Sequence, residues 1–113
     1  MRRAEVYDAG LSPTEGSEQA GSRPVLIVSR DAINLNSPVM VIVPLTRALR
    51  KRRLYPSHVR ISKTEGGLTD ESIAHCEQIR AIDKRRLVRF RGTISPGTMA
   101  RVDQALRITL DLD

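Results

Sequence analysis

With 113 residues, the chain is long enough for one domain with a modest core and too short for two. Its hydrophobic share of 40% argues against disorder, and its formal charge of +6 favours a polyanionic partner such as nucleic acid, an acidic protein or a membrane surface. The single cysteine, Cys76, excludes an internal disulfide, so a reducing cytoplasm is the simplest setting. No segment has the roughly 20 apolar residues that a bilayer span needs, so we expect neither a membrane span nor a signal peptide.

The first half of the sequence predicts three strands, over residues 5–7, 25–28 and 39–43. A long loop is expected between residues 10 and 22, because prolines and glycines interrupt it. Asp31 is expected to cap a short helical turn. Pro44 predicts a strand edge or a bulge, because proline cannot donate a hydrogen bond within a sheet.

The second half predicts further strands over residues 57–61, 72–82 and 90–94, with one helical turn at 83–87. Ser95 and Pro96 are typical of a helix start. The helix after them should pack one apolar stripe on the sheet, made of Met99, Val102, Ala105, Leu106 and Leu110. Several strands followed by one terminal helix predict a mainly β fold, a small barrel or curled antiparallel sheet with a C-terminal helix.

A polar cluster precedes the second strand and is the strongest functional signal. It contains Ser17, Glu18, Gln19 and Arg23, with Pro24 immediately after. Because Pro24 favours an extended conformation at the preceding residue, the guanidinium of Arg23 should project from a strand entrance, where it could meet a phosphate. The alternative is a tight turn in which Arg23 simply pairs with Glu18, and the residues alone do not separate the two.

Thr46 is the second candidate, because its hydroxyl follows a buried strand and precedes a basic loop. Threonine is also common in strands for its fit to a pleated surface. Two segments concentrate the positive charge, one with Arg47, Arg50, Lys51, Arg52 and Arg53, the other with Lys84, Arg85, Arg86, Arg89 and Arg91. Together they favour a groove that follows a phosphate backbone, the alternative being solvated loops. Aromatic residues are too few for a large base-stacking platform.

Four further residues carry weaker signals. His58 is expected to point to solvent and His75 to be packed, which gives little support to a two-histidine ribonuclease. Gln78 and Arg80 should share one face of their strand, either as ordinary surface polarity or as contacts to a substrate.

Three ordered motifs carry a resemblance to a known family: residues 16–21 followed by Arg23 and Pro24, residues 43–46, and residues 77–80. Together they closely resemble the MazF/PemK family of toxin endoribonucleases, over nearly the whole chain. The resemblance implies an SH3-like β-barrel of the plasmid-maintenance-toxin type, a homodimer and a MazE-like antitoxin with an acidic C-terminal segment. It also implies metal-independent, cofactor-free cutting of single-stranded RNA at short motifs, leaving 2′,3′-cyclic phosphate and 5′-hydroxyl ends.

Carried over by position, the resemblance implies that Arg23 and Thr46 are catalytic and that Glu18 is the motif carboxylate. The residues expected to bind RNA are Ser17, Gln19, Gln78, Arg80, Arg50 and Lys51. An arginine keeps its charge and so suits stabilisation of a phosphorane better than removal of a proton. Glu18 is the best local candidate base, although it could instead hold Arg23 in place.

Two other functions stay open at this point. One is a non-enzymatic toxin of the same barrel type that inhibits DNA gyrase, and the other is a nucleic-acid-binding module that uses only the basic segments. The RNA recognition sequence and the identity of the antitoxin do not follow from these residues.

Overall fold

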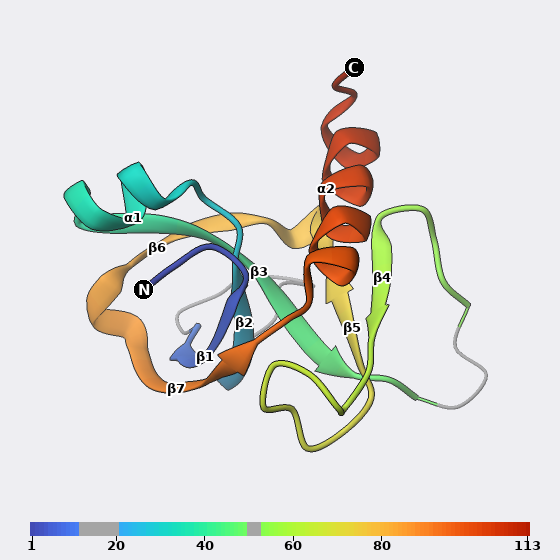
Figure 1. Ribbon diagram of the computed structural model, residues 1–113, viewed down its shortest axis with the longest axis horizontal. Helices are drawn as coiled ribbons and strands as arrows, with labels where there is room; N and C mark the ends of the chain where they lie inside the picture. The colour runs from blue at the N-terminus through green and yellow to red at the C-terminus, as the bar shows by residue number, and fades with distance from the viewer. Residues whose placement is uncertain (12–20, 50–52) are drawn as a thin grey trace.

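The computed structural model describes residues 1–11, 21–49 and 53–113. Figure 1 shows strands gathered around a long β3, with α1 near one end of that strand and α2 beside β4 and β5. In chain order the elements are β1 (Glu5–Gly10), β2 (Ser22–Ile27), α1 (Asp31–Asn36), β3 (Val39–Arg47), β4 (His58–Ile61), β5 (Ser72–His75), the 3-10 turn η1 (Cys76–Gln78), β6 (Arg80–Asp83), the 3-10 turn η2 (Lys84–Arg86), β7 (Leu87–Thr93) and α2 (Pro96–Leu110).

The described strands form one antiparallel sheet centred on β3. Its hydrogen-bonded order is β4-β5-β3-β2-β1-β7, and β6 pairs with another part of β3. Because β4 and β7 lie at the two ends of this order, the described strands form a curled sheet that does not close. The prediction of a mainly β fold with a C-terminal helix is confirmed.

β3 runs straight through Pro44, where the sequence predicted an edge or a bulge. On one side, β2 pairs with β3 as far as Pro44. On the other side, β6 pairs with Val39–Ile42 and β5 with Leu45–Arg47, so the partner changes around Pro44. A proline is tolerated in the middle of the sheet here because that side requires no hydrogen bond from its nitrogen.

The same change of partner corrects the predicted strand over residues 72–82. The chain leaves β3 after β5, makes the turn η1, and rejoins β3 as β6. The amide of Ile79 closes η1 by donating to the carbonyl oxygen of Cys76 at 3.2 Å. A continuous apolar run therefore contains two strands, because a hydrophobic pattern does not record where a strand exchanges one neighbour for another.

The main core lies between the sheet and α2. It includes Val6, Leu26, Val43, Leu45, Val59, Ile61 and Ala74 from the strands and Met99, Val102 and Ala105 from the helix. A second apolar cluster, which includes Val25, Ile27, Met40 and Ile42, is formed by other residues of the same strands. The sheet is therefore anchored firmly enough to hold side chains at its surface in defined positions.

The predicted start of the last helix is confirmed. The hydroxyl of Ser95 accepts a hydrogen bond from the amide of Thr98 at 3.2 Å, and Pro96 occupies the first turn. Glu65, from the turn after β4, accepts a bond from the Ser95 amide at 2.7 Å and from the Thr98 hydroxyl at 2.8 Å. A carboxylate at a helix N-terminus also stabilises the helix dipole.

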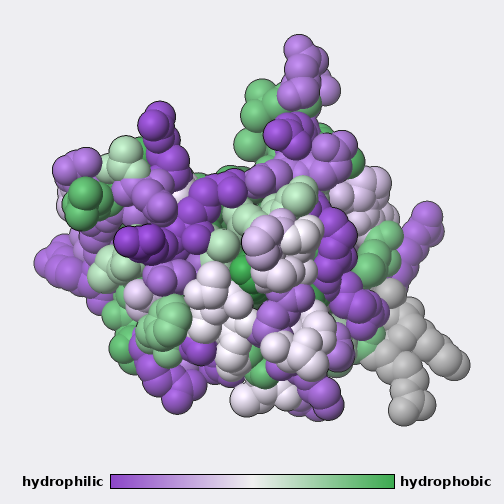
Figure 2. All heavy atoms as spheres, in the orientation of Figure 1, coloured by the Kyte–Doolittle hydropathy of each residue, from purple (hydrophilic) through white to green (hydrophobic). Residues whose placement is uncertain are grey.

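Two local predictions about the helices are wrong. Leu110 is 48% exposed, because the end of α2 extends beyond the sheet, and Figure 2 shows hydrophobic residues at the surface there. Asp31 does not cap α1: Arg30 holds the N-cap position, and Asp31 accepts a tertiary hydrogen bond from the amide of Arg3 at 2.8 Å.

No helix within the described part of the chain is long and apolar enough to cross a membrane.

Candidate active site

Arg23 and Thr46 occupy facing positions on neighbouring strands. The antiparallel register of β2 and β3 pairs Val25 with Pro44. Two residues further along each strand, the same register places Arg23 opposite Thr46, and residues two apart on a strand point to the same face. The extended conformation predicted at Arg23 is confirmed, since this residue lies within β2.

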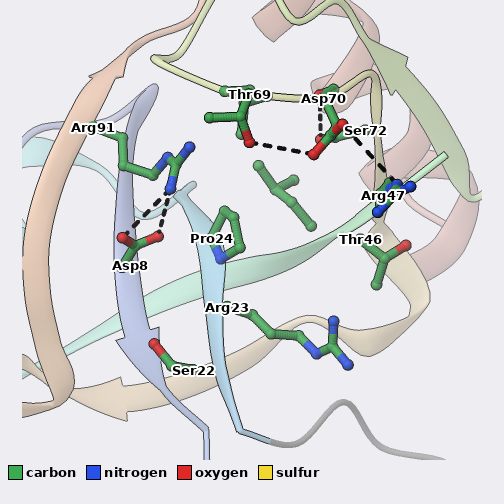
Figure 3. A pocket seen from close by; sticks show the side chains of 12 residues that line it. Asp8, Ser22, Arg23, Pro24, Thr46, Arg47, Thr69, Asp70, Ser72 and Arg91 are labelled. Carbon is green, nitrogen blue, oxygen red and sulfur yellow. Dashed lines mark hydrogen bonds and ion pairs between the residues drawn. The ribbon is translucent and has the colours of Figure 1, made fainter.

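These two residues line a pocket at the sheet surface. The pocket has a volume of about 330 Å³, which lies within the range of ligand-binding pockets. Its polar lining comes from β1, β2, β3, β5, β7 and the loop before β5: Asp8, Ser22, Arg23, Thr46, Arg47, Thr69, Asp70, Ser72 and Arg91. Figure 3 shows Arg23 and Thr46 on one side of this pocket and Asp8 and Arg91 on the other.

The charges around the pocket are unevenly compensated. Asp8 accepts hydrogen bonds from Arg91 at 3.1 Å and from Arg89 at 3.2 Å, so this side is held by an ion-pair network. Arg91 is fixed further by a bond of 2.9 Å to the carbonyl oxygen of Gly67. Arg47 lies 4.0 Å from Asp70 and is largely exposed. One wall of the pocket is thus an ion-pair network in which one carboxylate holds two arginines, and Arg47 adds an exposed cation to the lining.

Five of the residues predicted to form the site lie outside the described part of the chain: Ser17, Glu18, Gln19, Arg50 and Lys51.

Gln78 and Arg80 do not share one strand face, which corrects that prediction. Gln78 lies half-buried in η1, and Arg80 starts β6. Arg80 donates a hydrogen bond of 3.3 Å to the carbonyl oxygen of Leu11, the residue after β1. Arg80 therefore tethers the chain just before residues 12–20, where the candidate loop begins.

The second basic segment is largely engaged with the protein itself. Arg85 donates to Asp83 at 3.1 Å, and Arg86 donates to the carbonyl oxygen of Gly10 at 3.4 Å. Arg89 and Arg91 bind Asp8, as described above. These four arginines therefore already bond to groups of the protein. Any attraction of this segment for a phosphate backbone would come from the positive charge that remains in these networks.

A histidine lies directly behind Thr46. The Thr46 hydroxyl is 2.7 Å from Nε2 of His75, a buried residue at the end of β5. Thr46 pairs with Ile73 in the sheet, so His75 is its diagonal neighbour on the same face. His75 is packed, as the sequence predicted, but it is also bonded to a candidate catalytic side chain.

The second histidine extends this contact into a network. His58 is the cross-strand partner of His75, and their rings meet edge to face with centroids 4.8 Å apart. Oε2 of Glu77 lies 3.1 Å from Nε2 of His58 and 3.4 Å from Nδ1 of His75. The side chain of His58 is only 6% exposed, so the expectation that it points to solvent is wrong. Glu77 and the neighbouring ring cover it.

The environment of Glu77 favours its ionised form. Partial burial raises the pKa of this carboxyl, but hydrogen bonds from its own amide and from His58, together with the nearby imidazoles, bring the net pKa below the ordinary value. An ionised carboxylate can only accept hydrogen bonds. Both imidazoles must therefore direct a proton toward Glu77.

The same three side chains are the one group of potential metal ligands among the described residues, with ligand atoms within 4.8 Å of one another. The amide of Tyr55 donates to Nδ1 of His58 at 3.2 Å, which leaves the proton of the neutral ring on Nε2, facing Glu77. This arrangement is a hydrogen-bond network rather than a set of ligands open to a cation. Nearby Cys76 is buried in the main core, and burial raises the pKa of its thiol to about 12.

Sequence reasoning did not identify the wall of the pocket or the histidine behind Thr46. Asp8 and Arg91 come from opposite ends of the chain and meet only because β1 pairs with β7. Thr69 and Asp70 lie in a loop with no distinctive pattern. The polar His75 in an apolar run was the one signal that could have suggested a buried network.

The structure defines a class of small, mainly β proteins with a C-terminal helix and a polar pocket on the sheet, lined by Arg23 and Thr46. Comparison with known proteins identifies the family. The family of PemK-like, MazF-like toxins of type II toxin–antitoxin systems matches residues 2–110. An endoribonuclease MazF of Staphylococcus epidermidis is 42% identical over 113 residues, which is 100% of this chain and 93% of that protein.

Solved structures agree in fold. A mycobacterial endoribonuclease in complex with its cognate antitoxin is 27% identical and covers 100% of this chain and 97% of that chain, with a TM-score of 0.82. A MazF from Deinococcus radiodurans has a TM-score of 0.83 at 23% identity, over 99% of this chain and 97% of that chain. The chain belongs to the PemK/MazF family of toxins.

Proposed function

We propose that the Arg23–Thr46 pocket cuts single-stranded RNA without a metal ion. Family membership and the 42% identity over the full chain identify the protein as a toxin endoribonuclease of a type II toxin–antitoxin system, and they do not favour the gyrase inhibitor. The observation that carries the proposal is the cross-strand placement of a permanent cation opposite a hydroxyl, in one pocket.

The proposed reaction is an attack within the RNA itself. The ribose 2′-hydroxyl loses its proton, its oxygen bonds to phosphorus, and the bond from phosphorus to the 5′-oxygen breaks as that oxygen gains a proton. Arg23 stabilises the negative charge of the phosphorane, because its guanidinium can donate two parallel hydrogen bonds to phosphate oxygens. Thr46 orients the reacting group, and Glu18 is the predicted base. The products carry a 2′,3′-cyclic phosphate and a 5′-hydroxyl.

The proposal extends to the partners. The formal charge of +6 suits both RNA and an antitoxin with an acidic segment, which would compete for the same surface. The exposed apolar residues at the end of α2, Ile108, Leu110 and Leu112, offer part of a surface for the antitoxin or for a second copy in a homodimer. An mRNA substrate implies that the toxin acts in the cytoplasm.

The deciding experiment incubates purified protein with long single-stranded RNA in excess EDTA. Wild type should cut, and Arg23→Ala and Thr46→Ala should each be severely impaired while remaining folded by circular dichroism. Arg30→Ala is the matched control, because this exposed arginine precedes α1, at the end of β3 away from Thr46. Cutting by Arg23→Ala or Thr46→Ala at the wild-type rate would show that the activity belongs to another site or a contaminant.

A second substrate tests the nucleophile. Replacing the ribose at the cut position with deoxyribose removes the 2′-hydroxyl and should abolish cleavage. Continued scission of that RNA would exclude attack by the 2′-hydroxyl and with it the predicted cyclic phosphate ends.

A further inference from the structure

We propose that His75 is a positioning residue for Thr46, which it holds by accepting the proton of the threonine hydroxyl. The proposal rests on the proposed function, because it assigns a role within the same pocket. It starts from the distance of 2.7 Å between Oγ1 of Thr46 and Nε2 of His75, which is that of a well-formed hydrogen bond.

The direction of this bond follows from the other side of the ring. Glu77 favours its ionised form and can only accept, so Nδ1 of His75, at 3.4 Å from Oε2 of Glu77, is the donor. The proposal takes the ring as neutral, so that Nε2 keeps the lone pair. In that state Thr46 donates its single proton to His75.

The consequence concerns what Thr46 can offer to RNA. A hydroxyl that donates its proton to a neighbour keeps two lone pairs and can still accept. Thr46 lines the pocket, so its oxygen acts toward the substrate as an acceptor for the ribose 2′-hydroxyl, and it does not donate to the phosphate. The proposed role therefore differs from one in which the threonine donates to a phosphate oxygen.

The support behind His75 is rigid. His58 holds Glu77 from the opposite side at 3.1 Å, and the Tyr55 amide fixes the orientation of His58. His75 is 1% exposed, so water does not compete for Nε2. Fixing a catalytic hydroxyl through a chain of hydrogen bonds is a known way to reduce the cost of orienting it in the transition state.

Two substitutions separate the roles of the two ring nitrogens. The side-chain amide of His75→Gln reaches the position of Nε2 and can accept from Thr46, whereas the shorter amide of His75→Asn reaches only the position of Nδ1. Under single-turnover conditions we expect His75→Asn to cut about 10- to 100-fold more slowly and His75→Gln to stay close to wild type. Both variants should bind RNA with deoxyribose at the cut position as tightly as wild type, because that RNA lacks the group that Thr46 accepts.

The interaction can be tested for coupling. In the Thr46→Ala background, His75→Asn should cause no further loss of rate, because the partner it positions is already gone. Equal rates for His75→Gln and His75→Asn, or full additivity of Thr46→Ala and His75→Asn, would overturn the proposal.

Nitrogen-15 NMR of the wild-type imidazoles tests the same bond without RNA and without a variant. We expect His75 to carry its proton on Nδ1 and His58 on Nε2. A proton on Nε2 of His75 would overturn the inference even if RNA is cut. If wild type cuts no RNA while the expected protonation is found, the proposed function fails and the hydrogen bond stands.

Discussion

Replacing Arg23 separates the charge of the guanidinium from its shape. A unit charge about 4 Å from the reacting phosphate, at the effective dielectric of a protein surface, is worth about 4 kcal/mol. We therefore expect Arg23→Ala to lower the single-turnover cleavage rate by about 10³-fold. Arg23→Lys keeps a charge but loses the planar pair of donors, so its rate should fall less, by about 10-fold.

The assay is cleavage of a short fluorescent RNA by excess enzyme in EDTA, with thermal unfolding measured on the same samples. Because Arg23 lies at the start of β2 and is only half-buried, neither variant should lose much stability. If Arg23→Lys were as slow as Arg23→Ala, the positive charge would not be the main contribution. If Arg23→Ala were within 10-fold of wild type, the proposed stabilisation of the phosphorane would be wrong.

Three further predictions concern stability and reactivity. Glu65→Ala should destabilise the protein by about 2 kcal/mol, or about 8 °C in Tm, because two charge-assisted hydrogen bonds to the start of α2 are lost. Burial raises the pKa of Glu65, but these hydrogen bonds bring the net pKa below the ordinary value. The stabilisation by Glu65 is therefore complete above the ordinary carboxyl pKa and is lost as the pH falls through the lowered pKa. An acid unfolding curve of Glu65→Ala that matches wild type would contradict this. Val102→Ala should cost about 2 kcal/mol in urea unfolding, because the side chain is fully buried, whereas the control Leu112→Ala should stay within about 0.5 kcal/mol of wild type. Cys76, buried and with its pKa raised to about 12, should resist Ellman's reagent at pH 8 until the protein unfolds; rapid reaction of the native protein would contradict its placement in the core.

The local elements of this fold were largely predictable. Ser95 and Pro96 marked the helix start, because capping depends on residues close together in the sequence. The apolar runs located the strands for the same reason. The run over residues 72–82 was misassigned, because its break at η1 depends on which part of β3 lies beside it, and that is not encoded in a local pattern.

The site divides in the same way. By itself, the sequence determined that the backbone at Arg23 would be extended, because of the steric effect of Pro24. Its motifs also identified Thr46 as a candidate site residue. Only the tertiary structure decided that these two face each other across β2 and β3, that Asp8 bonds to both Arg89 and Arg91, and that the Thr46 hydroxyl lies within hydrogen-bond distance of His75. These contacts join residues that are far apart in the chain, and they exist only because strand register brings their side chains to one face.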